Sequence, residues 1–454
     1  MAPKGRHLGL LRCILVAMLS WHATTALVFP CKPLMRSSPP YNLRSPALSL
    51  SKATTSSYHS TLHGPRIPGR PSVSPSPTTF RSRLLHAATV TAESKPPPNL
   101  KPYIEKLLDG DHLTTDEARE VCAGVLGGSE PIQVASALML MRRNGETPEE
   151  VAGFVAAMKE ACVPVKIDGN MLDIVGTGGD GAHTINISTA AAILAAAAGC
   201  KTAKAGNRSV SSQCGSADVL EALGISMALT AEQVGECVAR CGMGFMFAPV
   251  NHPAMKMVAP IRKALGVRSV FNILGPLTNA AGAQRVVIGV FTNDLIDVMG
   301  KALMEVGNIE HGVVIHGAGL DEISPLGSST ILEIKNIAAK GSPKKQYQTK
   351  KFYFDPLEVG TPRCTLEDLR GGDAKENAAL MREALQGGDH TDAKRDAIVL
   401  NAGVGIYVFG LSESLEDGIL LARKTLNTGK GLEKLDEWIQ LTQELAPAEG
   451  EKRK

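Results

Sequence analysis

Two polar, glycine-rich stretches contain the side chains best suited to chemistry in this sequence. The first, residues 176–189, reads GTGGDGAHTINIST and follows the apolar run Leu172–Val175. The second, residues 204–212, reads KAGNRSVSS and overlaps the end of the short run Thr202–Lys204. Glycines let a backbone pass close to a ligand, and helix N-termini offer free N–H groups to anions. A helix-forming run follows each stretch, so the sequence predicts two strand–loop–helix units that bind a phosphorylated ligand.

The side chains of the two loops support this interpretation over that of ordinary polar turns. The first loop concentrates oxygen and amide groups within one turn: Asp180, Thr184, Asn186, Ser188 and Thr189. The second brings two cations and three hydroxyls: Lys204, Arg208, Ser209, Ser211 and Ser212. No Gly-Lys-Ser/Thr follows the first loop and the G-x-G-x-x-G spacing is absent, which excludes a Walker P-loop and a dinucleotide fingerprint. The pattern favours a polyphosphate or metal–phosphate site.

Two further stretches carry charges that could meet such a ligand. Asp321 and Glu322 follow the apolar run Val313–Ile315, and adjacent carboxylates suit a Mg²⁺ ion that bridges to phosphate oxygens; the alternative is a charged surface turn. Residues 251–268 predict a turn into an amphipathic helix with basic residues on one side. An arginine there could clamp a carboxylate through two hydrogen bonds or be an ordinary exposed charge.

The elements that position these residues follow from hydrophobic patterning. From residue 171 onward, short β-rich runs alternate with helices, which predicts an α/β domain with a mainly parallel sheet covered by helices. Loops at the carboxyl ends of adjacent strands would open on one crevice. Further strands are predicted at 285–291, 312–316, 330–335 and 351–354, and helices at 231–241, 293–306, 375–386, 392–409 and 412–426.

The region before this domain, residues 97–165, predicts a small helical domain with no catalytic pattern. Helices are predicted at Pro102–Leu108 and Pro131–Arg143, and capping residues at Thr114 and Thr147 begin two more. The apolar faces of these helices could also form a dimer surface.

The charge distribution separates the N-terminal segment from the rest of the chain. The first 92 residues hold 11 of the 48 Lys and Arg and no acidic residue, which leaves 37 basic against 45 acidic residues beyond them. This mildly acidic body argues against a nucleic-acid surface. Seven of nine cysteines lie beyond residue 92 without a pattern, which indicates reduced thiols.

The segment itself predicts a two-part leader. Residues 1–30 have a signal-peptide pattern, with an apolar run too short to span a membrane, and residues 31–92 have the composition of a disordered transit peptide. This combination predicts entry into a plastid through the secretory route, with no stable membrane association after processing. The alternative is a disordered basic tail behind a signal anchor. Residues 441–454 are predicted to be a charged tail.

Taken together, the motifs resemble those of the anthranilate phosphoribosyltransferase family of tryptophan biosynthesis. The resemblance covers about residues 97–440, in the family's order. The matching stretches are GTGGD (176–180), NIST (186–189), KAGNRSVSS (204–212), GSADVLEALG (215–224), residues 252–279, HGAGLDEIS (316–324), GGDAKENA (371–378) and NAG (401–403).

The resemblance implies a fold, an activity and residue roles. The fold is a small all-α domain at 97–165, joined by helices from about 252–275, and an α/β domain at 171–440 of the nucleoside phosphorylase/phosphoribosyltransferase kind. The activity is transfer of the phosphoribosyl group of 5-phosphoribosyl 1-pyrophosphate (PRPP) to the amine of anthranilate, with Mg²⁺, in a homodimer. The implied PRPP contacts are Gly176, Gly179, Asp180, Thr184, Asn186, Ile187, Ser188, Thr189, Lys204, Ala205, Gly206, Asn207, Arg208, Ser209, Val210, Ser211, Ser212 and Ser216. Ser188, Asp321 and Glu322 match the Mg²⁺ positions, and Gly176, Asn207 and Arg262 match the anthranilate contacts.

The sequence departs from the family pattern at the acceptor side. Ala205 stands where the family motif KHGN has histidine, and Gln213 and Cys214 replace the more common Lys-Ser. No acid–base residue is required, because the amine is already a nucleophile; His183 and His316 are therefore expected to be structural. Two alternatives remain: a pyrimidine nucleoside phosphorylase, which shares the fold but lacks the NIST and LDEIS combination, and a non-enzymatic homologue that binds nucleic acid or another ligand.

Overall fold

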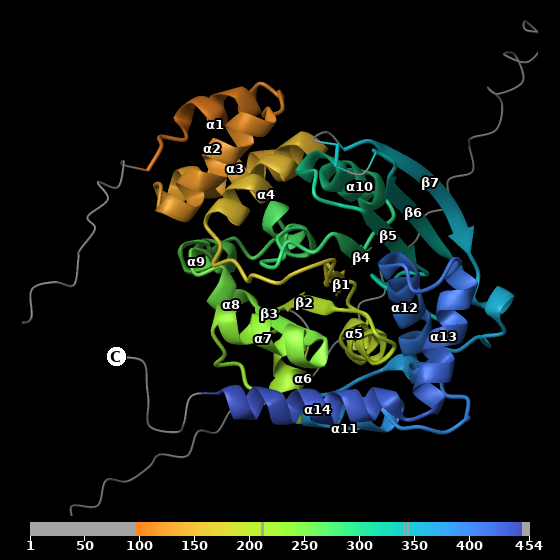
Figure 1. The fold of residues 1–454 in the computed structure, drawn as a ribbon. Helices are drawn as coiled ribbons and strands as arrows, with labels where there is room; N and C mark the ends of the chain where they lie inside the picture. The colour runs from red at the N-terminus through yellow and green to blue at the C-terminus, as the bar shows by residue number, and fades with distance from the viewer. Residues whose placement is uncertain (1–96, 210–212, 340, 343–344, 447–454) are drawn as a thin grey trace, which may run out of the picture. The chain divides into compact units, whose positions relative to one another are not determined.

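Four helices form the first part of the structure. The structure, a computed structural model, describes residues 97–209, 213–339, 341–342 and 345–446, all of which belong to one compact unit. The helices lie together at one end of this unit (Figure 1). Capping boxes at Thr114 and Thr147 begin the second and fourth, as predicted. Their bounds are α1 Lys101–Leu108, α2 Thr115–Gly127, α3 Pro131–Asn144 and α4 Pro148–Glu160.

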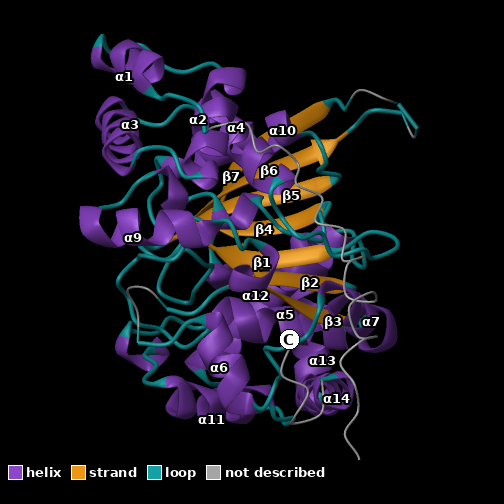
Figure 2. Cartoon of the chain, turned by 90° about the vertical axis from the view of Figure 1, so that its left-hand side faces the viewer, coloured by secondary structure: helices purple, strands orange, loops and turns teal. Residues whose placement is uncertain are grey.

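A seven-stranded sheet forms the centre of the remaining chain (Figure 2). Its order is β3-β2-β1-β4-β5-β6-β7. The first five strands are parallel to one another, whereas β6 pairs antiparallel with β5 and β7 pairs antiparallel with β6. Register places Gly176 opposite Gly289, so β1 and β4 end side by side. The strands are β1 Leu172–Gly176, β2 Thr202–Gly206, β3 Met243–Phe247, β4 Arg285–Gly289, β5 His311–Gly317, β6 Ser329–Asn336 and β7 Tyr347–Phe354.

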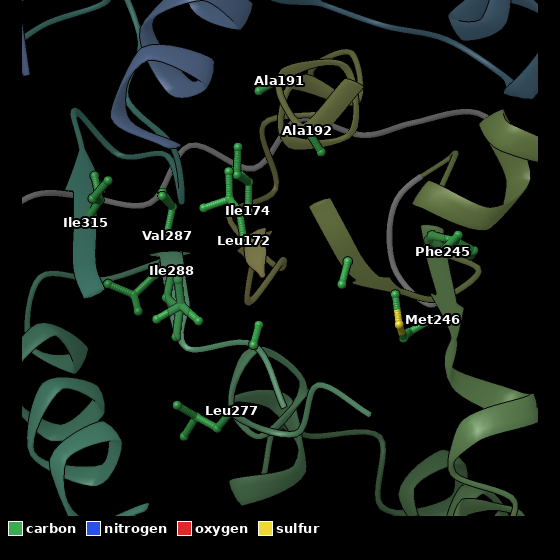
Figure 3. Close-up of a cluster of buried hydrophobic side chains, with 14 of the residues drawn as sticks. Leu172, Ile174, Ala191, Ala192, Phe245, Met246, Leu277, Val287, Ile288 and Ile315 are labelled. Carbon is green, nitrogen blue, oxygen red and sulfur yellow. The ribbon is translucent and has the colours of Figure 1, made fainter. Parts of the chain in front are cut away.

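Helices cover the sheet and confirm the predicted mainly parallel α/β class. The helix α5 packs on β1 and β2, α12 packs on β1, β4 and β5, and α10 packs on β5 and β6. Ala191 and Ala192 of α5 lie over one face of the sheet, and Leu277 lies on the other (Figure 3). The remaining helices are α5 Ile187–Ala197, α6 Ser216–Leu223, α7 Ala231–Cys241, α8 Ala248–Asn251, α9 Met255–Leu265, α10 Leu295–Val306, α11 Ala374–Leu385, α12 Ala393–Phe409, α13 Leu415–Asn427 and α14 Lys430–Leu445.

Three differences from the sequence-based expectation concern the edges of the domain. The strand β3 was not predicted, because MGFMF is apolar throughout and lacks the alternation that marks a half-buried strand. The strand β7 begins four residues before the predicted 351–354. The helix α14 continues to Leu445, so the boundary predicted at 440 for a charged tail is wrong.

Two global observations complete the fold. Six of the described cysteines are free thiols: Cys122, Cys162, Cys200, Cys237, Cys241 and Cys364. No helix in the described part of the chain is both long enough and apolar enough to cross a lipid bilayer. The predicted leader, residues 1–92, lies outside the described residues.

Candidate active site

The site is built where the order of the sheet reverses. The chain leaves β1 to form β2 on one side and returns to form β4 on the other. The carboxyl ends of β1 and β4 are therefore a topological switch point, the usual binding position in open parallel sheets. The predicted first loop leaves β1 at this position. The carboxylate turn that contains Asp321 follows β5, the next strand along.

The carboxylate turn lies directly on the ends of β1 and β4, and two glycines make this possible. A Cβ added to Gly289 would lie 1.5 Å from the Asp321 carbonyl oxygen, and one added to Gly176 would lie 2.2 Å from Asp321 Oδ2. The Gly178 N–H donates to the same Oδ2 at 2.6 Å. The backbone therefore approaches the turn more closely than any side chain would permit, and the first loop is bonded to Asp321.

Glu322 lies at the N-terminus of α5. The Ser188 N–H donates to Glu322 Oε1 at 3.1 Å, which joins this carboxylate to the free N–H groups of the helix. Its other oxygen, Oε2, is enclosed and accepts no hydrogen bond from any described residue. Asn401 of α12 fixes the next residue, because it accepts from the Ile323 N–H at 3.1 Å and donates to the Ile323 carbonyl at 2.7 Å. The sequence marked Asn401 only as part of a matching motif.

The two carboxylates are poorly stabilised as anions. Burial, followed by the negative charge of Asp180, raises the pKa of Asp321 to about 7. Burial, followed by repulsion from Asp321, raises the pKa of Glu322 well above its ordinary value. Three acidic side chains close together in an enclosed position require a compensating positive charge.

Lys204 supplies part of that charge from inside the fold. Its side chain is 1% exposed. Its ammonium group donates to the Ile174 carbonyl at 2.6 Å and to Ser188 Oγ at 3.5 Å. Burial lowers the pKa of Lys204, and the carboxylates of Asp173 and Glu322 oppose this shift. The structure thus brings the predicted residues Lys204 and Ser188 of the two loops together.

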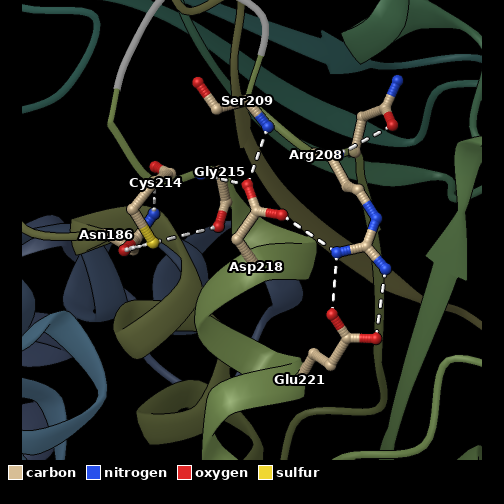
Figure 4. Close-up of polar contacts among 8 residues, drawn as sticks. Asn186, Arg208, Ser209, Cys214, Gly215, Asp218 and Glu221 are labelled. Carbon is tan, nitrogen blue, oxygen red and sulfur yellow. Dashed lines mark hydrogen bonds and ion pairs between the residues drawn. The ribbon is translucent and has the colours of Figure 1, made fainter. Parts of the chain in front are cut away.

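Asn186 joins three segments of the site instead of capping a helix. Asn186 occupies the N-cap position but makes no capping hydrogen bond. Its side chain donates to the Cys214 carbonyl at 3.1 Å and accepts from Asn377 at 3.0 Å. The polar chain of contacts at Cys214 is visible in Figure 4.

The second loop is folded onto α6. Arg208 forms ion pairs with Asp218 at 3.0 Å and with Glu221 at 2.8 Å (Figure 4), so its charge is already matched within the fold. Asp218 also accepts from the N–H groups of Ser209 and Gly215, each at 2.9 Å. The predicted contacts Val210, Ser211 and Ser212 lie outside the described residues.

The remaining predicted residues of the loops have the following positions. Ala205 donates its N–H to Asp173 Oδ1 at 3.1 Å, and Asn279 holds the other oxygen of that carboxylate at 2.7 Å. Ile187 and Ser216 are the first residues of α5 and α6, and Gly206 ends β2. Thr184 forms an isolated antiparallel β-bridge with Arg370, and Thr189 Oγ1 is buried with no partner among the described residues. Three acceptors complete the loops: Asn207 Oδ1 accepts from the Arg208 N–H, Asp180 Oδ1 accepts from the Ala182 N–H, and the Gly179 carbonyl accepts from Arg268.

Arg262 lies on α9, which packs against α2 and α3. Its guanidinium lies 6.0 Å from the ring centre of Phe271, which in turn packs edge-on against Phe154 of α4. Within the described ranges Arg262 forms no ion pair. Burial lowers the pKa of its guanidinium. A half-buried cation without a carboxylate partner is suited to an anionic ligand.

The histidines of the site have structural contacts. His316 Nδ1 bonds with the Val290 carbonyl at 2.8 Å. His183 has a left-handed backbone with φ of 54°, and its carbonyl accepts from the Gly371 N–H at 3.0 Å. Sequence reasoning missed Asn279, the role of Asn401 and the contact of Arg268 with the glycine loop, because only the fold brings these side chains close to the backbone atoms that they bind.

Comparisons with known proteins agree with this geometry. Residues 168–432 match the family described as glycosyl transferase family, a/b domain, and residues 101–162 match its helical bundle domain. The anthranilate phosphoribosyltransferase of Chlamydia felis is 42% identical over 346 residues, which cover 76% of this chain and 97% of that protein.

Solved structures give the same result. The crystal structure of the Thermus thermophilus anthranilate phosphoribosyltransferase has a TM-score of 0.68 and 42% identity, and the match covers 75% of this chain and 99% of that one. The Saccharomyces cerevisiae enzyme, solved with PRPP and Mg, has a TM-score of 0.69 and 27% identity over 76% of this chain and 98% of that one; it has also been solved with 4-fluoroanthranilate. The identity and near-complete coverage place this chain in the anthranilate phosphoribosyltransferase family.

Proposed function

We propose that this chain transfers the phosphoribosyl group of PRPP to the amine of anthranilate, which gives N-(5-phosphoribosyl)anthranilate and pyrophosphate in tryptophan biosynthesis. The observation that carries the proposal is the position of the Asp321–Glu322 pair against the glycine loop and the N-terminus of α5. Carboxylates bind Mg²⁺, and helix N–H groups bind phosphate oxygens, so the combination is suited to a metal-bound polyphosphate.

The donor PRPP occupies the crevice beyond β1, β2 and β4. The first loop offers backbone N–H groups and the hydroxyl of Ser188. Lys204, hydrogen-bonded to the Ile174 carbonyl and to Ser188, adds a positive charge near the carboxylates. Arg208 has a different part in this proposal from the one that the sequence implied: its two ion pairs with α6 make it a brace for the second loop.

The residues fit a Mg²⁺ ion. Glu322 Oε2 is a buried oxygen without a hydrogen-bond partner among the residues that the structure describes. The raised pKa values of Asp321 and Glu322 indicate that a nearby positive charge would stabilise both carboxylates as anions. Asp321 and Glu322, with Ser188, are the proposed ligands. When bound, the ion supplies positive charge that stabilises the departing pyrophosphate.

Arg262 is the proposed clamp for the anthranilate carboxylate. It has no ion-pair partner in the described part of the chain, and the aromatic ring of Phe271 lies beside its guanidinium. A planar guanidinium can bind a carboxylate through two parallel hydrogen bonds, which fixes the orientation of the attached ring.

The reaction depends on the orientation of the two substrates, and it needs no side chain that transfers a proton. The amine forms the new bond to C1 of the ribose, the bond from C1 to the pyrophosphate oxygen breaks, and the amine releases a proton to solvent. The charge that develops on the leaving group faces the N–H groups of the first loop and of α5, which are ordered before the reaction. Arg262 holds the acceptor, so the reaction becomes effectively unimolecular.

A fluorescence assay tests the proposal. The full chain with PRPP, Mg²⁺ and anthranilate should lower the anthranilate fluorescence, and omission of any one component should prevent the loss. A folded protein that leaves the fluorescence unchanged would refute it. Thymidine cleavage by phosphate would instead support a nucleoside phosphorylase, and salt-sensitive DNA retention would support the binding-protein alternative.

We also propose a homodimer formed through the helical domain. Leu108 of α1, Ile132 of α3 and Met257 of α9 are 65%, 74% and 45% exposed, on helices that pack against one another. Closed two-fold dimers are the commonest way to cover such a surface, with a second copy of the chain as the partner. Sedimentation should give a dimer for the native chain and a monomer for Ile132→Lys; a native monomer at micromolar concentration would refute the proposal.

The proposed destination is the plastid. The support is the composition of residues 1–92, which combine a signal-like segment with an acid-free, Ser-rich segment. Both parts would be removed during import. A mature N-terminus upstream of residue 31 in the native protein would contradict this route.

A further inference from the structure

Arg268 is the last residue of the predicted basic stretch 251–268, and in the structure it touches the glycine loop. It follows α9 by three residues and is exposed. Its guanidinium Nη2 donates to the Gly179 carbonyl, and the same group stacks on Phe291 at 4.1 Å from the ring centre. Phe291 follows β4, whose last residue, Gly289, lies under the carboxylate turn. One side chain therefore connects α9, β4 and the first loop.

The glycine loop needs such a contact because its backbone is unusually free. Gly178, Gly179 and Gly181 all have positive φ, at 68°, 83° and 76°. Glycine has more conformational freedom to lose on ordering than any other residue. In the described structure, two backbone groups of Gly178–Gly181 are hydrogen-bonded to side chains outside the loop: the Gly178 N–H donates to Asp321, and the Gly179 carbonyl accepts from Arg268.

These two contacts differ in whether a bound Mg²⁺ ion would compete with them. Asp321 is a proposed ligand of Mg²⁺, so its bond to Gly178 competes with the ion. Arg268 has no such competitor, and it forms no ion pair with any described residue that would draw it away. The stacking on Phe291 fixes the plane of the guanidinium and leaves one edge directed at the loop.

We propose that Arg268 is a positioning residue that holds the donor loop in its binding shape. It acts through the Gly179 carbonyl, so that the neighbouring N–H groups face the crevice where the diphosphate of the donor binds. Because Arg268 follows the helix that carries Arg262, it also ties the loop for one substrate to the segment for the other. This inference deepens the proposed function and rests on it for the identity of the donor.

Hydrogen exchange provides a test that does not depend on activity. In the full chain without substrates, Arg268→Ala should raise amide exchange in peptides that span residues 176–183 by about ten-fold, since one charged hydrogen bond is lost. Lys263→Ala is the matched control, because it removes one exposed cation from the neighbouring end of α9 and should leave that exchange unchanged. Unchanged exchange in Arg268→Ala, or an equal rise in Lys263→Ala, would overturn the proposal.

Kinetics and a second variant distinguish positioning from general stability. Arg268→Ala should raise the KM for PRPP by roughly five- to fifty-fold at an unchanged melting temperature, and Arg268→Lys should recover part of the loss. Phe291→Leu should also raise the KM for PRPP, and the double variant with Arg268→Ala should have a KM little higher than that of Arg268→Ala alone. Fully additive effects would overturn the proposal. If the native chain has no transferase activity but exchange still depends on Arg268, the loop contact stands and the proposed function fails.

Discussion

Gly289→Ala should inactivate the protein while leaving most of the fold intact. The added Cβ would lie 1.5 Å from the carbonyl oxygen and 2.4 Å from the carbonyl carbon of Asp321, and both are backbone atoms that no rotamer change can move. An ordinary contact requires about 3.4 Å, so the turn must move by about 2 Å. That movement displaces the Asp321–Glu322 pair from the loop and from α5.

The size of the effect follows from this displacement. A misplacement of about 1 Å can cost about a hundred-fold in rate, so we expect kcat/KM to fall by at least about a hundred-fold. Overpacking of this kind also costs about 1–3 kcal/mol of stability, which a domain of this size tolerates. Anthranilate fluorescence measures the first effect and urea denaturation the second.

Gly275→Ala is the matched control. It adds the same methyl group at a position without a positive φ, where a Cβ would have no atom of the described structure within 4 Å apart from those of the adjacent residues. This variant should retain near-native activity and stability. If Gly289→Ala keeps more than about half of the native kcat/KM, the close approach of the carboxylate turn to β4 has no functional importance and the reasoning is wrong.

Three further predictions concern charged groups. Asp321→Asn with Glu322→Gln should abolish Mg²⁺-dependent activity without loss of folded structure, because the native pair is already strained as two anions; near-native turnover would place the metal elsewhere. Arg262→Ala should raise the anthranilate KM by roughly ten- to a hundred-fold and leave the PRPP KM nearly unchanged, whereas Ala205→His should alter the anthranilate KM much less; the reverse order would mean that the acceptor is held by another residue. Burial alone would raise the pKa of Glu333, but hydrogen bonds from His311, Tyr407 and Lys335 outweigh it and lower the pKa to about 2. Glu333 therefore stabilises the fold above its unfolded pKa of 4.5 and loses this effect as pH falls toward 2. Denaturation should show Glu333→Gln less stable by about 1–3 kcal/mol at pH 7, with a difference that shrinks below pH 4.5; a difference independent of pH would refute this.

The sequence predicted the fold where local signals were strong. The capping boxes at Thr114 and Thr147, the strand before the glycine loop and the helix after it were all found. The class and the mainly parallel sheet followed from the alternation of strands and helices. The strand β3 escaped prediction because a short, wholly apolar run does not distinguish a buried strand from a buried helix.

The candidate site was only partly predictable, for a physical reason. Residue types identified Asp321, Glu322 and Lys204 as chemically important, and the structure brings them together. Pairing between side chains and backbone depends on which loops the fold brings close. The Asn186 contact with Cys214, the Arg208 brace on α6 and the Asn401 clamp on Ile323 have no local signature.

The measurement that tests the central claim most directly is the stoichiometry of the two products in one reaction. The full chain with Mg²⁺ and PRPP should release one pyrophosphate for each anthranilate consumed, and a mass spectrum should show phosphoribosyl anthranilate as the other product. Without anthranilate, pyrophosphate release should fall to the uncatalysed level. Equal pyrophosphate release with and without anthranilate, or consumption of anthranilate without pyrophosphate, would contradict a transferase built on this site.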